Sequence, residues 1–251
     1  MTPSSSSPTP RVTAAPNMAT QVMNHVRDCI HDGTMSTGNW YSVYQLSEEL
    51  GISRSPVRDG LLRLEEVGLI EFVRNRGFRI VESQPSDVAD IFDLRLSIEP
   101  NAAARAARDR SADELAHMKD IIAAMKVSCT DGDENVFFTW DQELHDAILA
   151  AGHARRGRDI LSKLRTHTRL LSDSTVRRYR SLEQVHSEHL PIIEAIAVRD
   201  SEAAHTAMTE HITATGRLLL EQAVSKKHPE YSEDELSTAI EEIWQQQVAQ
   251  F

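Results

Sequence analysis

Few residues of this sequence are of the kinds that build covalent frameworks, tight turns or membrane spans. The 251 residues include two cysteines, Cys29 and Cys129, so neither a disulfide framework nor a zinc knuckle of paired cysteines can form. So little cysteine fits a reducing, cytoplasmic setting. The longest apolar runs span a few residues, which excludes a membrane span. Glycine (10 residues) and aromatic residues (5%) are scarce, and abundant alanine, leucine and glutamate predict a mainly α-helical protein.

Positive charge is also scarce. The formal net charge is −11, and residues 84–251 hold 19 basic against 29 acidic residues. Residues 19–83 hold seven arginines and nine acidic residues, which is nearly balanced. A general affinity for polyanions is therefore excluded. A nucleic-acid surface, if the chain has one, must be a local patch in the first third of the sequence.

Composition and periodicity divide the chain into three parts. Residues 1–17 are mostly serine, threonine and proline with almost no large apolar groups, which predicts a disordered tail. Residues 18–83 are predicted to form a small domain of three helices and a β-hairpin. Residues 84–251 are predicted to form an all-helical domain that binds an effector and dimerises.

The small domain is predicted from helix stripes and from the residues that end helices. Val22, Val26 and Ile30 recur at four-residue spacing, which places them on one face of a first helix. A second helix ends at Gly51, and a third begins after Ser53, which is a suitable N-cap. The short turn between these two helices contains a glycine, as a helix-turn-helix motif requires.

A β-hairpin follows the third helix and completes a winged helix-turn-helix. Apolar residues alternate with charged or smaller ones over residues 70–80, and the tip carries Arg74, Arg76 and Gly77. The two arginines suit phosphate or a narrow minor groove of DNA. In this fold the third helix enters the major groove with its N-terminus first.

The first turn of the third helix carries the side chains expected to contact DNA. Arg54 and Arg58 are four residues apart and share a helix face, and arginine binds both phosphate and the guanine edge. Ser53 and Ser55 can donate hydrogen bonds to phosphate. The alternative interpretation is a solvated helix face with no DNA contact. The basic wing that follows this helix favours DNA binding.

From residue 84 onward the sequence is predicted to be helical throughout. Amphipathic segments joined by short connections predict an all-α helical bundle. The seven predicted segments are approximately 87–109, 112–129, 134–151, 156–173, 181–198, 201–224 and 233–249. Pro100 and Pro191 lie inside two of these segments and are predicted to kink or divide the helices.

Polar residues at or beside apolar stripes of this bundle predict a metal site. Asp141 and His145 are four residues apart, so both side chains can reach one point. His189 and His211 each occupy a position on the apolar stripe of their helix. Imidazole and carboxylate ligands suit zinc, nickel, iron or manganese. The alternative is that these four are hydrogen-bonded core residues without a ligand role.

Other histidines are weaker candidates. His186 lies one helical turn before His189 but off the apolar stripe, so it is a substitute ligand at most. His25 is interpreted as a surface residue, as are His31, His117, His205 and His228.

The string LSEELGISRSPVRDGLLRLEEVGLIEFVRNRGFRI closely resembles the DNA-binding domain of the GntR family of bacterial transcription regulators. Its run Leu-Gly-Ile-Ser-Arg-Ser-Pro-Val-Arg is similar to the signature of that family. The resemblance implies that Arg54, Ser55 and Arg58 contact the operator, assisted by the wing from Arg74 to Gly77. Gly60 departs from the family pattern, in which alanine is usual.

The strings LRLSIEPNAAARAA, DQELH, SEHLPIIEAI and RDSEAAHTAMTEH resemble the FCD ligand-binding domain of the FadR-like subgroup of that family. The resemblance implies that Asp141, His145, His189 and His211 are the ligands of a divalent metal. Zinc is the first choice, with nickel, iron or manganese as alternatives.

These patterns together predict a cytoplasmic, homodimeric, metal-containing transcription regulator rather than an enzyme. It would bind double-stranded operator DNA, and a small carboxylate beside the metal would modulate that binding. Arg95 is expected to pair with the carboxylate, and a structural salt bridge with Glu99 is the alternative. Two other functions stay open: a regulator that responds to the metal ion itself, and a metal-dependent enzyme with an attached DNA-binding domain.

Overall fold

The computed structural model describes residues 17–82, 84–171, 176 and 179–248. These residues form two compact units, divided between Glu82 and Ser83. Of the segment 1–17 that composition predicts to be disordered, residues 1–16 lie outside the described part of the chain. Asn17 caps the first helix, because its side-chain oxygen accepts a hydrogen bond from the backbone N–H of Thr20.

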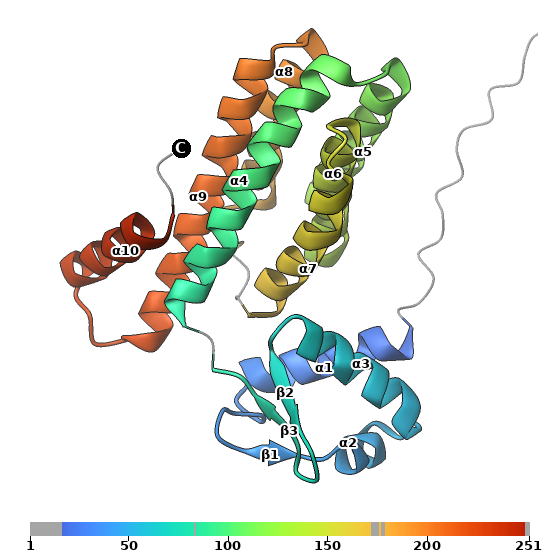
Figure 1. Ribbon diagram of the computed structural model, residues 1–251, viewed down its shortest axis with the longest axis vertical. Coiled ribbons are helices and arrows are strands. Elements are labelled where there is room, and N and C mark those ends of the chain that lie inside the picture. Colours follow the sequence, from blue (N-terminus) through green and yellow to red (C-terminus); the bar gives the residue numbers. More distant parts are fainter. Residues whose placement is uncertain (1–16, 83, 172–175, 177–178, 249–251) are drawn as a thin grey trace, which may run out of the picture. The chain divides into compact units, whose positions relative to one another are not determined.

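The first unit combines three helices with a small antiparallel sheet (Figure 1). Its elements are α1 (Met18–His31), β1 (Trp40–Tyr41), α2 (Val43–Leu50), α3 (Arg54–Glu66), β2 (Ile70–Val73) and β3 (Gly77–Ile80). The strand order is β1-β3-β2, so the predicted hairpin is confirmed and a third strand joins its β3 edge. In the register, Trp40 lies opposite Arg79 and Phe72 opposite Phe78.

Helix α1 packs closely against α3 through the apolar stripe that the sequence predicts. Val22 and Val26 of α1 are fully buried, as is Leu61 of α3. Gly60 lies where the two helices are closest, since a Cβ on it would be 2.7 Å from the carbonyl oxygen of Ala19. The approach of the helices therefore explains a glycine that lowers the intrinsic helix propensity of α3.

Gly51 and Gly77 of this unit adopt backbone conformations with positive φ that other residues rarely adopt. Gly51 has φ +64° and ends α2 in the left-handed conformation, as the sequence predicts. Gly77 has φ +100°, and the carbonyl oxygen of Tyr41 occupies the space that a side chain would need. Gly77 therefore allows β1 to pair closely with β3 in the wing, because any larger residue would push the two strands apart.

The described residues of the second unit are almost all helical, and the helices agree closely with the predicted segments. They are α4 (Pro85–Asp109), α5 (Ala112–Asp131), α6 (Glu134–Ala151), α7 (Arg155–Leu171), α8 (Leu182–Val198), α9 (Ser201–Lys227) and α10 (Glu233–Gln247). The long helices α4 and α9 run side by side (Figure 1), and α6 and α8 also pack against α4.

Pro100 and Pro191 each lie inside an uninterrupted helix, α4 and α8 respectively. Of the two predicted outcomes, a kink or a division of each helix, division is therefore wrong. A proline removes one backbone hydrogen bond, but the buried faces before and after it keep each helix packed against its neighbours.

The core of the second unit lies among α4, α5, α6, α8 and α9. Phe92 of α4, Leu144 of α6, Ile192 of α8 and Ile212 of α9 are fully buried. The last three lie within one helical turn of the histidines that the sequence singles out, so the core fixes the helices that carry them. Among the described residues, no helix is both long and apolar enough to cross a membrane.

Candidate metal centre and nucleic-acid interface

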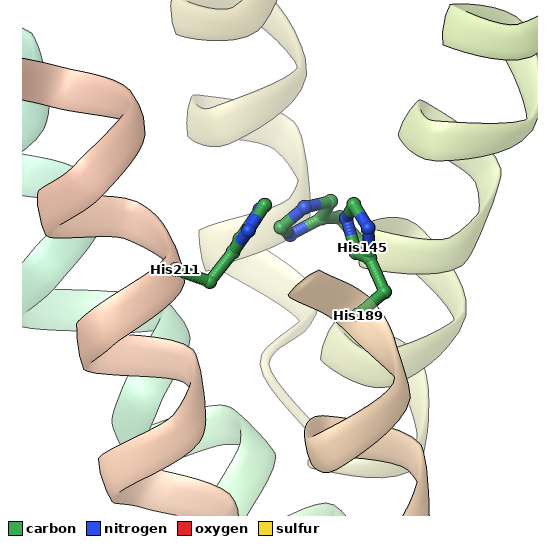
Figure 2. Close-up of side chains that lie close together, drawn as sticks. All are labelled: His145, His189 and His211. Carbon is green, nitrogen blue, oxygen red and sulfur yellow. The ribbon is translucent and has the colours of Figure 1, made fainter. Parts of the chain in front are cut away.

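Three histidines from three helices converge inside the second unit, and their rings point toward one another (Figure 2). His145 comes from α6, His189 from α8 and His211 from α9, and all three are buried. One possible ligand atom of each lies within 4.8 Å of those of the other two. His186 is also buried but is not one of the converging histidines.

Two of the histidines are oriented by acceptors behind them. His145 Nδ1 lies 2.6 Å from Oε2 of Glu99, a residue of α4. His189 Nδ1 lies 2.8 Å from the carbonyl oxygen of Val185, one turn earlier on α8. Metal-binding histidines generally donate the second ring N–H to such acceptors, which fixes the tautomer and the ring orientation. The Nε2 atoms of both rings are thereby left for a cation.

Glu188 takes the corresponding place beside the third histidine. Its Oε2 lies 3.3 Å from His211 Nδ1 and accepts a hydrogen bond of 2.6 Å from Arg180. Burial opposes the ionisation of Glu188, but its contacts with His211 and Arg180 outweigh burial and lower the pKa of the carboxyl group. A carboxylate therefore stands next to His211.

Asp141, the fourth predicted ligand, is not among the side chains whose donor atoms all lie within 4.8 Å of one another, but its Oδ1 lies 3.1 Å from His189 Nε2. His189 Nε2 makes no well-oriented hydrogen bond within the described residues, although this atom is buried. Buried nitrogens without hydrogen bonds are rare in folded proteins and need a partner. Three imidazoles and a carboxylate form a suitable donor set, so the residues present fit a divalent transition metal.

Burial favours the neutral form of two of the imidazoles, those of His211 and His145. It lowers the pKa of His211 to about 3, with a further contribution from neighbouring His189. It also lowers the pKa of His145, although the charge of Glu99 opposes the shift. Burial disfavours the ionised form of Asp141, but the contact with His189 and the nearby imidazoles hold its pKa well below the ordinary range. Neutral imidazole and ionised carboxylate are the forms that bind metal.

Glu99 binds two arginines in addition to His145. Its Oε1 accepts a hydrogen bond of 2.7 Å from Arg95, and its Oε2 accepts one of 2.6 Å from Arg165. Burial opposes the ionisation of Glu99, but the two arginines outweigh it and hold the pKa well below its usual value. Arg95, expected from the sequence to meet an effector or Glu99, is paired with Glu99.

Arg165 of α7 is a site residue that sequence reasoning missed. It is 8% exposed, and its Nε makes no hydrogen bond to the described part of the chain. Leu161, one turn earlier on α7, is fully buried, so Arg165 occupies an inward-facing position of the helix. A charged residue on the apolar face of a predicted helix is the sequence signal that could have identified Arg165.

The N-terminus of α3 presents the side chains that are predicted to contact DNA. Ser53, Arg54, Ser55 and Arg58 are all exposed. Ser53 is the N-cap, yet its side chain makes no capping hydrogen bond, so its hydroxyl is free to donate to phosphate. The backbone N–H groups at the start of a helix also attract phosphate.

Two arginines of the wing lie over the ring of one aromatic residue. Arg74 and Arg76 are exposed at the tip between β2 and β3. The guanidinium of Arg76 lies 5.5 Å from the ring centre of Trp40, and that of Arg79 lies 5.8 Å from it. Trp40, which the sequence did not single out, therefore orients two cationic side chains of the wing.

The first unit has an exposed helix that carries arginines and a basic wing, and the second is a helical domain with a buried polar cluster. Together these features define a transcription regulator of the winged-helix class. Comparison with family models specifies the class further. Residues 18–80 match the model of the bacterial regulatory proteins of the gntR family, and residues 90–214 match that of the FCD domain. The chain belongs to the GntR family and carries an FCD domain, a type that can bind metal. The family consists of transcription regulators, not enzymes.

Curated relatives and a solved structure agree with this assignment. The HTH-type transcriptional regulator LutR of Bacillus subtilis is 28% identical over 211 residues, with 73% of this chain and 93% of that protein covered. The HTH-type transcriptional repressor RspR of Escherichia coli is 24% identical, with 74% and 81% covered. The structure of E. coli McbR/YncC covers 83% of this chain and 99% of its own, at 19% identity and a TM-score of 0.63, and so shares the fold.

Proposed function

We propose that the chain is a cytoplasmic regulator whose affinity for its operator is set by a small organic acid, bound beside a divalent metal in the second unit. The observation that carries the proposal is the convergence of His145, His189 and His211 beside Asp141. Nitrogen and carboxylate ligands suit zinc, which is the first choice, and nickel, iron and manganese are the alternatives. When bound, the metal would act as a Lewis acid that coordinates the effector.

The charges around the cluster support an anionic effector. Arg95 and Arg165 balance Glu99 and Asp141, so these four groups carry no net formal charge. A divalent cation would add two positive charges to this region, where an uncompensated charge is unfavourable. The carboxylate groups of an organic acid would offset that charge.

The arginines also support a carboxylate through their hydrogen-bonding capacity. Guanidinium groups bind carboxylates by paired hydrogen bonds, and Arg165 Nε is a buried donor that makes none within the described residues. Arg95 lies on the other oxygen of the same Glu99. We infer that the effector contacts Arg165, Arg95 or both.

We further propose that a homodimer binds an operator with two-fold symmetry, through Ser53, Arg54, Ser55 and Arg58 in the major groove and the wing of each copy. A single winged module buries little DNA surface and is rarely specific enough alone. Two-fold dimers are the most frequent symmetric solution.

The proposal is tested with operator fragments selected from genomic DNA by the purified chain. Operator affinity is then measured for metal-loaded and metal-free protein, with mono-, di- and tricarboxylates as probes. We expect one class of acid to change the affinity by about tenfold or more, in the loaded protein alone. The variant His189→Ala should not respond, whereas His117→Ala, which alters an exposed histidine, should respond normally.

Two outcomes would replace or reject this function. If the metal alone changes operator affinity and no acid adds to the change, the metal ion itself is the signal. If neither metal nor acid changes the affinity of a folded protein, the second unit does not control DNA binding in this way.

A further inference from the structure

A second cluster of metal-binding side chains lies in the first unit, on the surface between α1 and α2. His25 and Cys29 are four residues apart on α1, and Glu49 reaches them from α2. One donor atom of each lies within 4.8 Å of those of the other two. Because the histidine and the cysteine are i and i+4 on one helix face, both side chains can bind the same ion.

Two of the three separations between these donor atoms lie near the edge lengths of a tetrahedral site. His25 Nε2 lies 3.5 Å from Cys29 Sγ and 3.1 Å from Glu49 Oε1. Zinc bonds of about 2.3 Å to sulfur and about 2.1 Å to nitrogen or oxygen, at tetrahedral angles, place such ligands about 3.6 Å and about 3.4 Å apart. Both separations are slightly shorter than these values, and the sulfur and the carboxylate oxygen lie within 4.8 Å of each other, so rotation of the side chains would admit a zinc ion.

The surroundings favour a cation and give it access. Cys29 is 6% exposed, whereas the side chains of His25 and Glu49 are 30% and 55% exposed, so an ion can enter from solvent. Burial raises the pKa of the Cys29 thiol, and the negative charges of Asp32 and Glu49 raise it further. The same negative charges attract a divalent ion, whose binding would displace the thiol proton.

We propose that His25, Cys29 and Glu49 form a zinc-type metal site with one thiolate ligand, separate from the histidine cluster of the second unit. A bound ion would tie α1 to α2, the first helix of the helix-turn-helix motif. Two donors come from one helix and the third from the next, so binding would restrain the position of α2. This proposal does not depend on the proposed effector, because its ligands all lie in the DNA-binding unit.

Cobalt provides the direct test, because a thiolate bound to Co²⁺ gives an intense charge-transfer absorption in the near ultraviolet. The ligand set proposed for the second unit contains no sulfur and cannot give this band. The full-length protein is reduced with a non-chelating phosphine and titrated with Co²⁺, and zinc is then added. We expect the band to appear and to be bleached by zinc, which binds thiolate and imidazole more tightly than cobalt does.

Matched variants assign the ligands. Cys29→Ser should abolish the band, whereas Cys129→Ser should keep it. Glu49→Gln should weaken cobalt binding by about tenfold or more, and its neighbour Glu48→Gln should leave it unchanged. His189→Ala should keep the band while losing the metal of the second unit, so failures of the two proposals are distinguishable. Absence of the band at saturating cobalt in the folded protein, or its persistence in Cys29→Ser, would overturn the proposal.

Discussion

Oε2 of Glu99 and Nδ1 of His145 lie 2.6 Å apart, and both side chains are 1% exposed. The same carboxylate holds the guanidinium groups of Arg95 and Arg165. One buried group thus orients a candidate metal ligand and fixes the two cations that we propose for effector binding. An anion that draws the arginines away from Glu99 would leave this carboxylate without their counter-charge while it still contacts His145, and we propose this as the route from effector to metal.

Glu99→Gln should disrupt both the fold and the metal site. The substitution keeps the shape of the side chain but leaves two buried arginines without their counter-charge. Breaking a buried ion pair in this way destabilises a protein by about 3–5 kcal/mol. The loss of an acceptor behind a metal-binding histidine weakens metal affinity by about 10–100-fold. Urea unfolding and competition with a zinc chelator measure the two effects.

The matched control is Glu71→Gln. Glu71 pairs with Arg79 across β2 and β3, but both side chains are about half exposed, so the change should stay within about 1 kcal/mol. If the Glu99 and Glu71 variants lose the same stability and Glu99→Gln binds metal normally, the role assigned to Glu99 is wrong.

Arg54→Ala and Arg58→Ala should each weaken operator binding by about 1–3 kcal/mol, because both side chains are exposed at the start of α3. Arg63→Ala is the matched control, since this exposed arginine lies in the last turn of the same helix. Binding is followed by fluorescence anisotropy at a fixed salt concentration. Wild-type affinity in both variants, with folding intact, would refute the assignment of α3 as the recognition helix.

The metal-free protein should lose stability as the pH falls below the ordinary pKa of histidine. His211 has a pKa of about 3 in the fold, so below about pH 6.5 the unfolded chain binds a proton that the folded chain does not. The free energy of unfolding should therefore fall with decreasing pH, by up to about 1.4 kcal/mol per pH unit for this residue. Chemical unfolding in the presence of a chelator, at about pH 7 and about pH 5, measures the slope.

Two variants isolate the contribution of His211 to this slope. His211→Gln should flatten the dependence, because glutamine does not titrate. His117→Gln should keep the wild-type slope, since the side chain of His117 is 57% exposed. An identical slope in wild type and His211→Gln would show that His211 does not cause the loss.

The protein should be a homodimer in solution at micromolar concentration. Static light scattering should give twice the mass of one chain, both alone and bound to one operator duplex. A mass of one chain in both conditions would contradict the dimer and would require a different account of operator specificity.

The extents of the helices could be predicted because capping residues are local. The predicted segment 112–129 corresponds to α5, whose start is set by Ser111 and Glu114, which each accept a hydrogen bond from the other's backbone N–H. The predicted segment 233–249 corresponds to α10, which starts in the same way after Ser232. Strand β1 escaped prediction because two residues cannot show an alternating pattern.

The contacts between helices could not be predicted, because periodicity shows which face is buried but not what that face meets. His189 and His211 stand out on their apolar stripes, and the structure places them together with His145. Glu99, by contrast, meets Arg165 across 66 residues of sequence. An inward-facing arginine and its acid lie on different helices, and only the packing of α4 against α7 brings them together.

Anomalous scattering from crystals grown with zinc shows directly whether the three histidines and Asp141 bind a metal. Data collected on both sides of the zinc absorption edge locate the ion and identify it. We predict a peak in the second unit, about 2.0–2.2 Å from one nitrogen each of His145, His189 and His211 and from an oxygen of Asp141. Ordered histidines with no peak between them at saturating zinc, and equally at saturating nickel and manganese, would rule out a metal at this site.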